Sequence, residues 1–122
     1  MSVPLRAEYA STIRTVAAAL GADAGFSIDE LDDVRLALSE VFSALTDGAD
    51  GGRAHVSFVV ADGSAHIEIR SDDASRSIDL DELALGILRS VTDRFEIAGG
   101  VIVLVKHATE ASAGPVTNVS PS

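Results

Sequence analysis

Glu40 and Arg14 are the two side chains whose type and position best suit chemistry or recognition. Glu40 lies within a helical pattern and could act as a general base, although a carboxylate on a solvated helix face is the commoner role of a single glutamate. Arg14 follows Ile13 on the flank of an apolar stripe, where its guanidinium could form a bidentate bond to a carboxylate of a partner. The simpler interpretation of Arg14 is a solvated side chain that pairs with Glu8 or with nothing.

The sequence offers few other side chains that commonly act in catalysis or metal binding. The sequence has no cysteine, which excludes disulfides, thiolate zinc sites and cysteine nucleophiles. His55, His66 and His107 have no acidic or serine companion at the spacing of a zinc site or a catalytic set, so we expect them on the surface or at strand edges. The acidic residues at positions 29, 30, 32 and 33 favour the positive end of a helix dipole over a metal site.

Composition and charge limit the possible partners. A chain of 122 residues suits one domain with one core, and its net charge of −10 disfavours binding to nucleic acid or to an anionic membrane. The same charge would attract a basic protein partner, or it could serve solubility alone. No apolar run approaches the ~20 residues of a membrane span, and the first residues lack the order of a signal peptide. We therefore expect a cytoplasmic protein.

Apolar residues recur every three or four positions in three stretches, which predicts three helices. The first covers residues 5–20, and residues 21–25 interrupt it. The second begins with the capping-box spacing of Ser27 and Glu30 and ends near residues 47–52, whose glycines permit a left-handed C-cap. The third covers residues 79–94. The expected inward-facing residues are Leu5, Tyr9, Ile13, Val16 and Leu20; Leu31, Val34, Leu38, Val41 and Leu45; and Leu80, Leu83, Ile87, Leu88 and Val91.

Two other stretches predict β-hairpins. In residues 56–69, apolar and polar positions alternate on both sides of a turn at 61–64, and in residues 95–105 a tight glycine turn precedes an apolar run. Residues 108–122 have no period and are expected to form a flexible tail. The order of elements predicts one α+β domain over residues 1–107, a two-layer sandwich whose mainly antiparallel or mixed sheet carries three helices on one face.

Several segments resemble one family in the same order along the chain. The most specific is residues 31–41, and the others are Val3-Pro4, Glu8-Tyr9, Ile13-Arg14, residues 25–27, residues 86–95 and residues 99–106. On these residues the sequence resembles the small serine/threonine-kinase anti-sigma factors of bacteria, which belong to the histidine-kinase-like ATPase superfamily. The resemblance covers about residues 3–106 and implies the histidine-kinase-like ATPase fold.

The first family motif is only half present. In active members, a glutamate polarises the attacking group, and an asparagine four residues later helps to hold the magnesium that bridges the phosphates. Glu40 matches the glutamate, but Ala44 stands at the asparagine position, and a methyl group cannot bind a cation. Asp72 matches the aspartate that binds adenine in the family, yet the glycine that should follow it is missing.

The remaining motif positions have also changed. Glu82 and Ala84 stand where the family has two glycines that receive phosphate at the start of a helix. Val101 stands at the position of a phosphate-binding threonine and has no hydroxyl group. The resemblance is therefore to a degenerate member of the family, with little or no ATP binding and no cofactor.

The resemblance implies an anti-sigma-factor-like regulator that acts by protein–protein binding. Its expected partners are a sigma factor or a STAS-like anti-anti-sigma protein, with Arg14 at the contact, and the chain is expected to form a homodimer. The alternative is an active serine/threonine-protein kinase that binds magnesium-ATP, uses Glu40 as base and Asp72 for adenine, and phosphorylates an anti-anti-sigma factor. A third possibility is a pseudo-ATPase whose partner lies outside transcription.

Overall fold

Two β-hairpins supply four of the five strands, as the alternating pattern predicts. In the computed structural model, which describes residues 1–73 and 77–109, β2 (Arg53–Ala61) pairs with β3 (Ser64–Ser71), and β4 (Arg94–Ala98) pairs with β5 (Val101–His107). The loop of the first hairpin is Asp62-Gly63, and both residues have positive φ, the conformation that fits the right-handed twist of the strands. β3 and β5 pair at the centre, giving the strand order β1-β2-β3-β5-β4 with every pairing antiparallel.

The start of the chain differs from the prediction. Residues 5–9 are not part of the first helix: β1 (Ser2–Pro4) pairs with β2, and the amide of Leu5 donates to the carbonyl of Gly52 at 3.0 Å. A short 3-10 turn, η1 (Ala7–Tyr9), then leads into α1 (Ala10–Asp23), which extends to Asp23 and so includes the first three of residues 21–25, where the interruption was predicted. Leu5 is buried as expected, but it is buried from the turn that follows β1, where its amide is satisfied by Gly52.

α2 (Ile28–Thr46) forms where the capping signal predicts it. The amide of Glu30 donates to the Ser27 hydroxyl at 3.1 Å, and the amide of Ser27 donates to Oε1 of Glu30 at 2.8 Å, so the capping box is confirmed. The helix ends just before Gly48, whose φ is +72°. Its buried face follows the predicted stripe, with Val34, Leu38, Val41 and Leu45 in the core.

α3 (Glu82–Val91) is shorter than the predicted 79–94. Asp81 is its N-cap, since the amide of Ala84 donates to Oδ1 of Asp81 at 2.8 Å, and the backbone is extended again at Thr92. Ala84, Leu88 and Val91 face the core, at the spacing of one helix face. The prediction that Leu83 faces inward is wrong, because Leu83 lies on another side of this helix and is 74% exposed.

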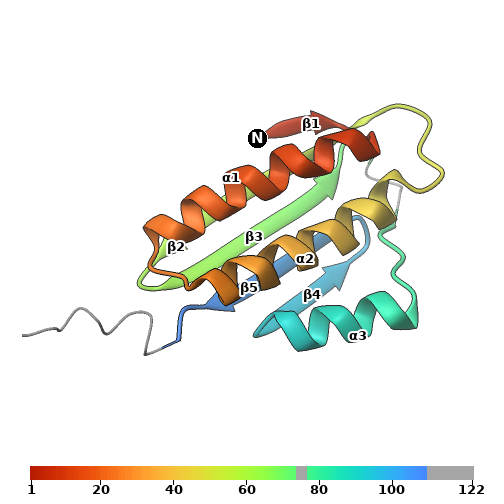
Figure 1. Cartoon of the computed structure of the whole chain (residues 1–122). Helices are drawn as coiled ribbons and strands as arrows, with labels where there is room; N and C mark the ends of the chain where they lie inside the picture. Colours follow the sequence, from red (N-terminus) through yellow and green to blue (C-terminus); the bar gives the residue numbers. More distant parts are fainter. Residues whose placement is uncertain (74–76, 110–122) are drawn as a thin grey trace, which may run out of the picture.

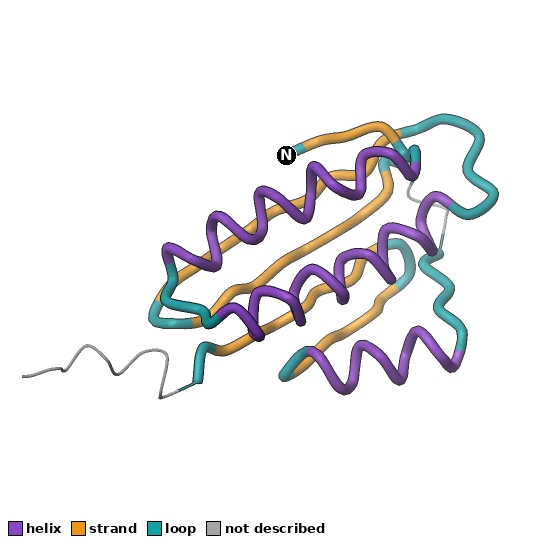
Figure 2. Tube along the Cα trace, in the orientation of Figure 1, coloured by secondary structure: helices purple, strands orange, loops and turns teal. Residues whose placement is uncertain are grey.

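The helices and the sheet form two layers. Figures 1 and 2 show α1, α2 and α3 on the same side of the sheet, with α1 nearest β1 and β2, and α3 nearest β4. The core lies between the layers and includes Phe42, Ile69, Leu88 and Ile102. The other side of the sheet, here called the open face, carries no helix of the described chain. No helix in the described residues is long and apolar enough to cross a membrane.

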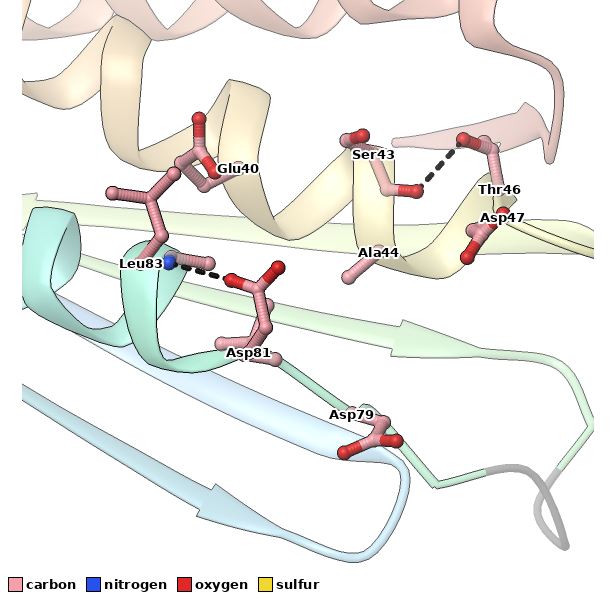
Figure 3. A pocket seen from close by; sticks show the side chains of 10 residues that line it. Glu40, Ser43, Ala44, Thr46, Asp47, Asp79, Asp81 and Leu83 are labelled. Carbon is pink, nitrogen blue, oxygen red and sulfur yellow. Dashed lines mark hydrogen bonds between the residues drawn. The ribbon is translucent and has the colours of Figure 1, made fainter.

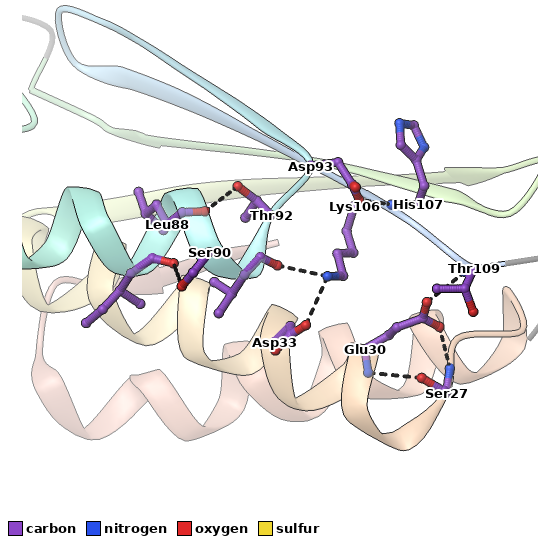
Figure 4. A network of polar contacts seen from close by, with 12 residues as sticks. Ser27, Glu30, Asp33, Leu88, Ser90, Thr92, Asp93, Lys106, His107 and Thr109 are labelled. Carbon is purple, nitrogen blue, oxygen red and sulfur yellow. Dashed lines mark hydrogen bonds and ion pairs between the residues drawn. The ribbon is translucent and has the colours of Figure 1, made fainter.

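Lys106 ties both helices to the end of β5. Its Nζ donates to Oδ2 of Asp33 on α2 at 3.0 Å and to the carbonyl of Val91 at the end of α3, also at 3.0 Å (Figure 4). The Lys106 side chain is 14% exposed. Because the ammonium satisfies a carbonyl at a helix C-terminus and a carboxylate of the neighbouring helix, it fixes the position of α3 relative to α2.

The first residues of the predicted tail contact the domain. The amide of Ala108 donates to the carbonyl of Gly63 at 2.7 Å, and the amide of Thr109 donates to Oε2 of Glu30 at 2.7 Å. Residues 110–122, where the rest of the tail was predicted, lie outside the described residues.

Candidate functional site

A cavity lies between the C-terminal half of α2 and the segment that leads into α3 (Figure 3). Its volume is about 560 Å³, and α2 supplies one wall while residues 79–84 supply the other. The lining residues of the described chain are Glu40, Ser43, Ala44, Thr46, Asp47, Asp79, Leu80, Asp81, Leu83 and Ala84.

Three of the residues singled out from the sequence meet at this cavity. Glu40 and Ala44 lie one helical turn apart on the same side of α2, and Ala84 faces them from α3. Glu82, by contrast, is an exposed residue of the first turn of α3 and does not line the cavity. The structure thus brings together three positions that resemble the family motif, where the side chains are the carboxylate of Glu40 and the methyl groups of Ala44 and Ala84.

The cavity is strongly acidic. Glu40, Asp47, Asp79 and Asp81 all line it, and no Lys, Arg or His of the described residues does. No local pattern in the sequence identified Asp47, Asp79 or Asp81 as a residue of a site. Their convergence with Glu40 is a tertiary effect, and the one signal for it in the sequence is the density of acidic residues at both helix ends.

A carboxylate of the chain itself lies at the N-terminus of α3. The carboxylate of Asp81 accepts from the amide of Ala84, which is one of the free amides that a bound phosphate would use (Figure 3). A phosphate group would therefore have to displace Asp81 and remain beside its charge. Ala44 points towards Asp81 from α2 and offers no oxygen to a metal ion.

Asp72 and Val101 lie away from this cavity. Val101 pairs with Arg70 and Ala98 and faces the open side of the sheet, because its neighbour Ile102 is fully buried under the helices. Both residues line a second cavity of about 360 Å³ together with His55, Arg70, Ser71 and Gly100. The predicted nucleotide positions are thus divided between two sides of the sheet.

The carboxylate of Asp72 has a structural contact. Its Oδ1 accepts from the amide of Arg53 at 3.1 Å, and the amide of Asp72 donates to the carbonyl of Arg53 at 3.0 Å. These two bonds join the end of β3 to the start of β2. Asp72 therefore closes the open end of the first hairpin in this structure.

The side chain of Arg14 links α1 to α2 and does not form the ion pair with Glu8. Its Nη1 donates to the hydroxyl of Ser39 on α2 at 3.2 Å, while Glu8 forms its ion pair with Arg6. Arg14 is half-buried, so part of the residue remains accessible. A partner that docked across α1 and α2 would meet it.

The histidines are distributed over the sheet. His55 and His66 lie in β2 and β3, and His107 ends β5, where its Nδ1 is 2.6 Å from the hydroxyl of Ser64. No group of three or more His, Cys, Asp or Glu side chains in the described residues is arranged to hold a metal ion.

No protein-family model matches this sequence, and no curated protein matches it either. The resemblance to anti-sigma-factor kinases therefore depends on the segments quoted above. The residues that line the cavity can be compared with the needs of a magnesium-nucleotide site. A magnesium nucleotide needs a cation ligand beside Glu40 and free amides at the start of α3, and the residues present do not fit these requirements, because position 44 is a methyl group and Asp81 occupies the amide.

Proposed function

We propose that this chain is an anti-sigma-factor-like regulator that binds another protein and does not use ATP. The observation that carries the proposal is the cavity between α2 and α3, which has the two motif helices around it but presents four carboxylates. A unit charge about 4 Å from a like charge is repelled by about 1 to 4 kcal/mol, depending on screening. Repulsion from several carboxylates would oppose the binding of a triphosphate in the cavity. It does not affect contacts that a protein partner makes with the outer surfaces.

The fold is consistent with this assignment. The α+β architecture, with a five-stranded antiparallel sheet and helices on one face, agrees with the layers of a histidine-kinase-like ATPase domain. The resembling segments also fall on corresponding elements: residues 31–41 lie in α2, and residues 86–95 run from α3 into β4. We propose the histidine-kinase-like ATPase fold on this basis.

The proposed partners are a sigma factor or an anti-anti-sigma protein of the STAS type. In this proposal a homodimer of this chain binds either partner in the cytoplasm. The acidic surface would accelerate encounter with a basic partner, and Arg14 would supply a cation that can bind a partner carboxylate in a bidentate manner. Neither contact requires a nucleotide.

Isothermal titration calorimetry with magnesium-ATP tests the absence of nucleotide binding. We expect no heat of binding from the native chain at millimolar nucleotide. Micromolar binding would support the alternative, an active serine/threonine kinase that uses Glu40 as base and Asp72 for adenine. A variant with the family residues restored, here called the motif-restored variant, serves as a comparison; it carries Ala44→Asn, Glu82→Gly, Ala84→Gly and Val101→Thr.

Purification from the native host, with bound proteins identified by mass spectrometry, tests the partner class. Recovery of a sigma factor or of a STAS-type antagonist supports the proposal. Recovery of partners from outside transcription, without either of these, would favour the third possibility of a pseudo-ATPase with another role.

Substitution of Arg14 tests whether this residue contacts the protein partner. Arg14→Ala should leave the fold intact and weaken binding of the recovered partner by about tenfold, the effect of losing a charge-assisted hydrogen bond. Ser39→Ala is the matched control, because it removes the internal bond of Arg14 but keeps the guanidinium. Equal affinities for the native chain and Arg14→Ala would remove Arg14 from the interface.

A further inference from the structure

The outer edge of β2 is only partly covered. β1 pairs with Arg53, Ala54 and His55, and one more pair of hydrogen bonds joins Met1 to Val56. Beyond Val56, no strand of the described chain pairs with this side of β2, whose other side pairs with β3 along its full length to Ala61. The segment from Ser57 to Ala61, here called the free edge, is therefore a strand with one open side.

The register shows which backbone groups point outward along the free edge. The carbonyl of Gly52 accepts from Leu5, and Val56 exchanges bonds with Met1 at 2.8 Å and 2.6 Å, so these residues direct their backbone groups towards β1. In an antiparallel ladder every second residue points to the same side. Phe58 and Val60 therefore direct two N–H and two C=O groups outward, and none of these has a backbone partner in the described residues.

The free edge also lacks the features that usually prevent strand pairing. Residues 56–61 read Val-Ser-Phe-Val-Val-Ala, with no charge and no proline. Val59 is 59% exposed on the open face, where it would contact an added strand. The opposite edge of the sheet differs, because β4 carries the charged residues Arg94 and Glu96. Only one of the two edges thus presents an uncharged, unpaired strand.

We propose that the free edge binds an extended segment of another protein as an additional antiparallel strand, in line with β1. The pairing of β1 with the same edge shows that this side of β2 accepts a short strand. The open length fits about five residues. The preferred segment is apolar at alternate positions and neutral or basic, because the chain has a net charge of −10 and would repel an acidic peptide.

A second copy of this chain fits the free edge less well than a separate segment. If Phe58 paired with Val60 of a copy, the antiparallel register would place Asp62 of that copy opposite Val56, where Met1 already pairs. Asp62 belongs to a hairpin turn with a φ of +54°, which does not continue a strand.

A designed pentapeptide tests the proposal by NMR on the full chain. The probe alternates lysine and valine and is acetylated and amidated, and its controls are the fully N-methylated peptide and the peptide with glutamate in place of lysine. We expect the lysine peptide to shift the amide signals of Phe58 and Val60 saturably and to slow their hydrogen exchange. The N-methylated peptide should produce no shift, and the glutamate peptide a weaker one.

Two substitutions make the test specific for the edge. Val60→Pro removes one outward N–H without touching the β2–β3 ladder and should weaken binding by about tenfold. If this variant does not fold, Val59→Lys places a charge beside the edge and should weaken binding of the lysine peptide similarly.

Other outcomes would overturn the inference. Unchanged Phe58 and Val60 signals at millimolar lysine peptide, or equal shifts from the N-methylated peptide, would show that the edge does not accept a strand. Protection of the same two amides without peptide, increasing with protein concentration, would show that a second copy occupies it. This outcome concerns only the edge, and the tests of nucleotide and partner binding above are independent of it.

Discussion

Replacing Lys106 by methionine should destabilise the domain, because the ammonium holds α2, α3 and β5 together. Methionine keeps most of the length of the side chain and its packing but removes the charge. The bonds lost are those to Oδ2 of Asp33 and to the carbonyl of Val91, both 3.0 Å long in the structure.

The expected loss of stability follows from these contacts. A hydrogen bond with a charged partner contributes about 1.5 to 3 kcal/mol, which sets the upper range for each bond. Two effects reduce the sum: methionine avoids the desolvation of an ammonium that is 14% exposed, and the carboxylate of Asp33, at 39% exposed, can be hydrated again. We expect a net loss of about 2 kcal/mol, or about 8 °C in the melting temperature of a domain of this size.

Urea denaturation followed by circular dichroism measures this loss. The matched control is Arg70→Met, since Arg70 is exposed on β3 and its side chain forms no hydrogen bond or ion pair with a described residue. The control should change stability by less than about 0.5 kcal/mol. If Lys106→Met and Arg70→Met gave the same stability, the assignment of Lys106 as the link between the helices would be wrong.

Two further predictions concern the hairpin end and the cavity. Gly52→Ala should lower the free energy of unfolding by about 1 to 2 kcal/mol, because φ is +93° and the added Cβ would lie 3.1 Å from Oδ1 of Asp72. Urea denaturation of Gly51→Ala is the control, because Gly51 has a similar φ of +88° but no neighbour within 4 Å. Equal losses of stability in the two variants would show that the contact with Asp72 contributes nothing. The motif-restored variant should still fail to bind magnesium-ATP in calorimetry, because Asp81 keeps its charge and its bond to Ala84. Adding Asp81→Gly frees that amide at little cost to the helix and should give the first measurable binding, whereas binding by the motif-restored variant alone would show that Asp81 is not the obstacle.

Much of the fold could be predicted from local patterns. The capping box at Ser27 fixed the start of α2, and the turn at residues 61–64 fixed the first hairpin, because both signals depend on residues a few positions apart. The boundaries of the first and third helices were predicted less well. Leu5 suited a helical stripe by its spacing, and only its bond to Gly52, distant in sequence, holds it in the turn after β1 instead.

The candidate site was predicted in part. Glu40, Ala44 and Ala84 could be placed near one another from the resemblance, and they line one cavity. Val101 could not be placed, because residues 101–105 are all apolar and such a run does not show which alternate positions face the core. Its pairing with β3 put Ile102 and Leu104 under the helices and turned Val101 to the open face.

The sequence by itself determined the helices, the hairpins, the acidic charge and the methyl group at position 44, since each depends on residue type or on short-range spacing. The tertiary structure decided three other properties: the meeting of Asp79 and Asp81 with Glu40, the link through Lys106, and the free edge of β2. These depend on contacts between segments that are far apart in the chain. Such contacts are set by packing of the two layers, which no local pattern encodes.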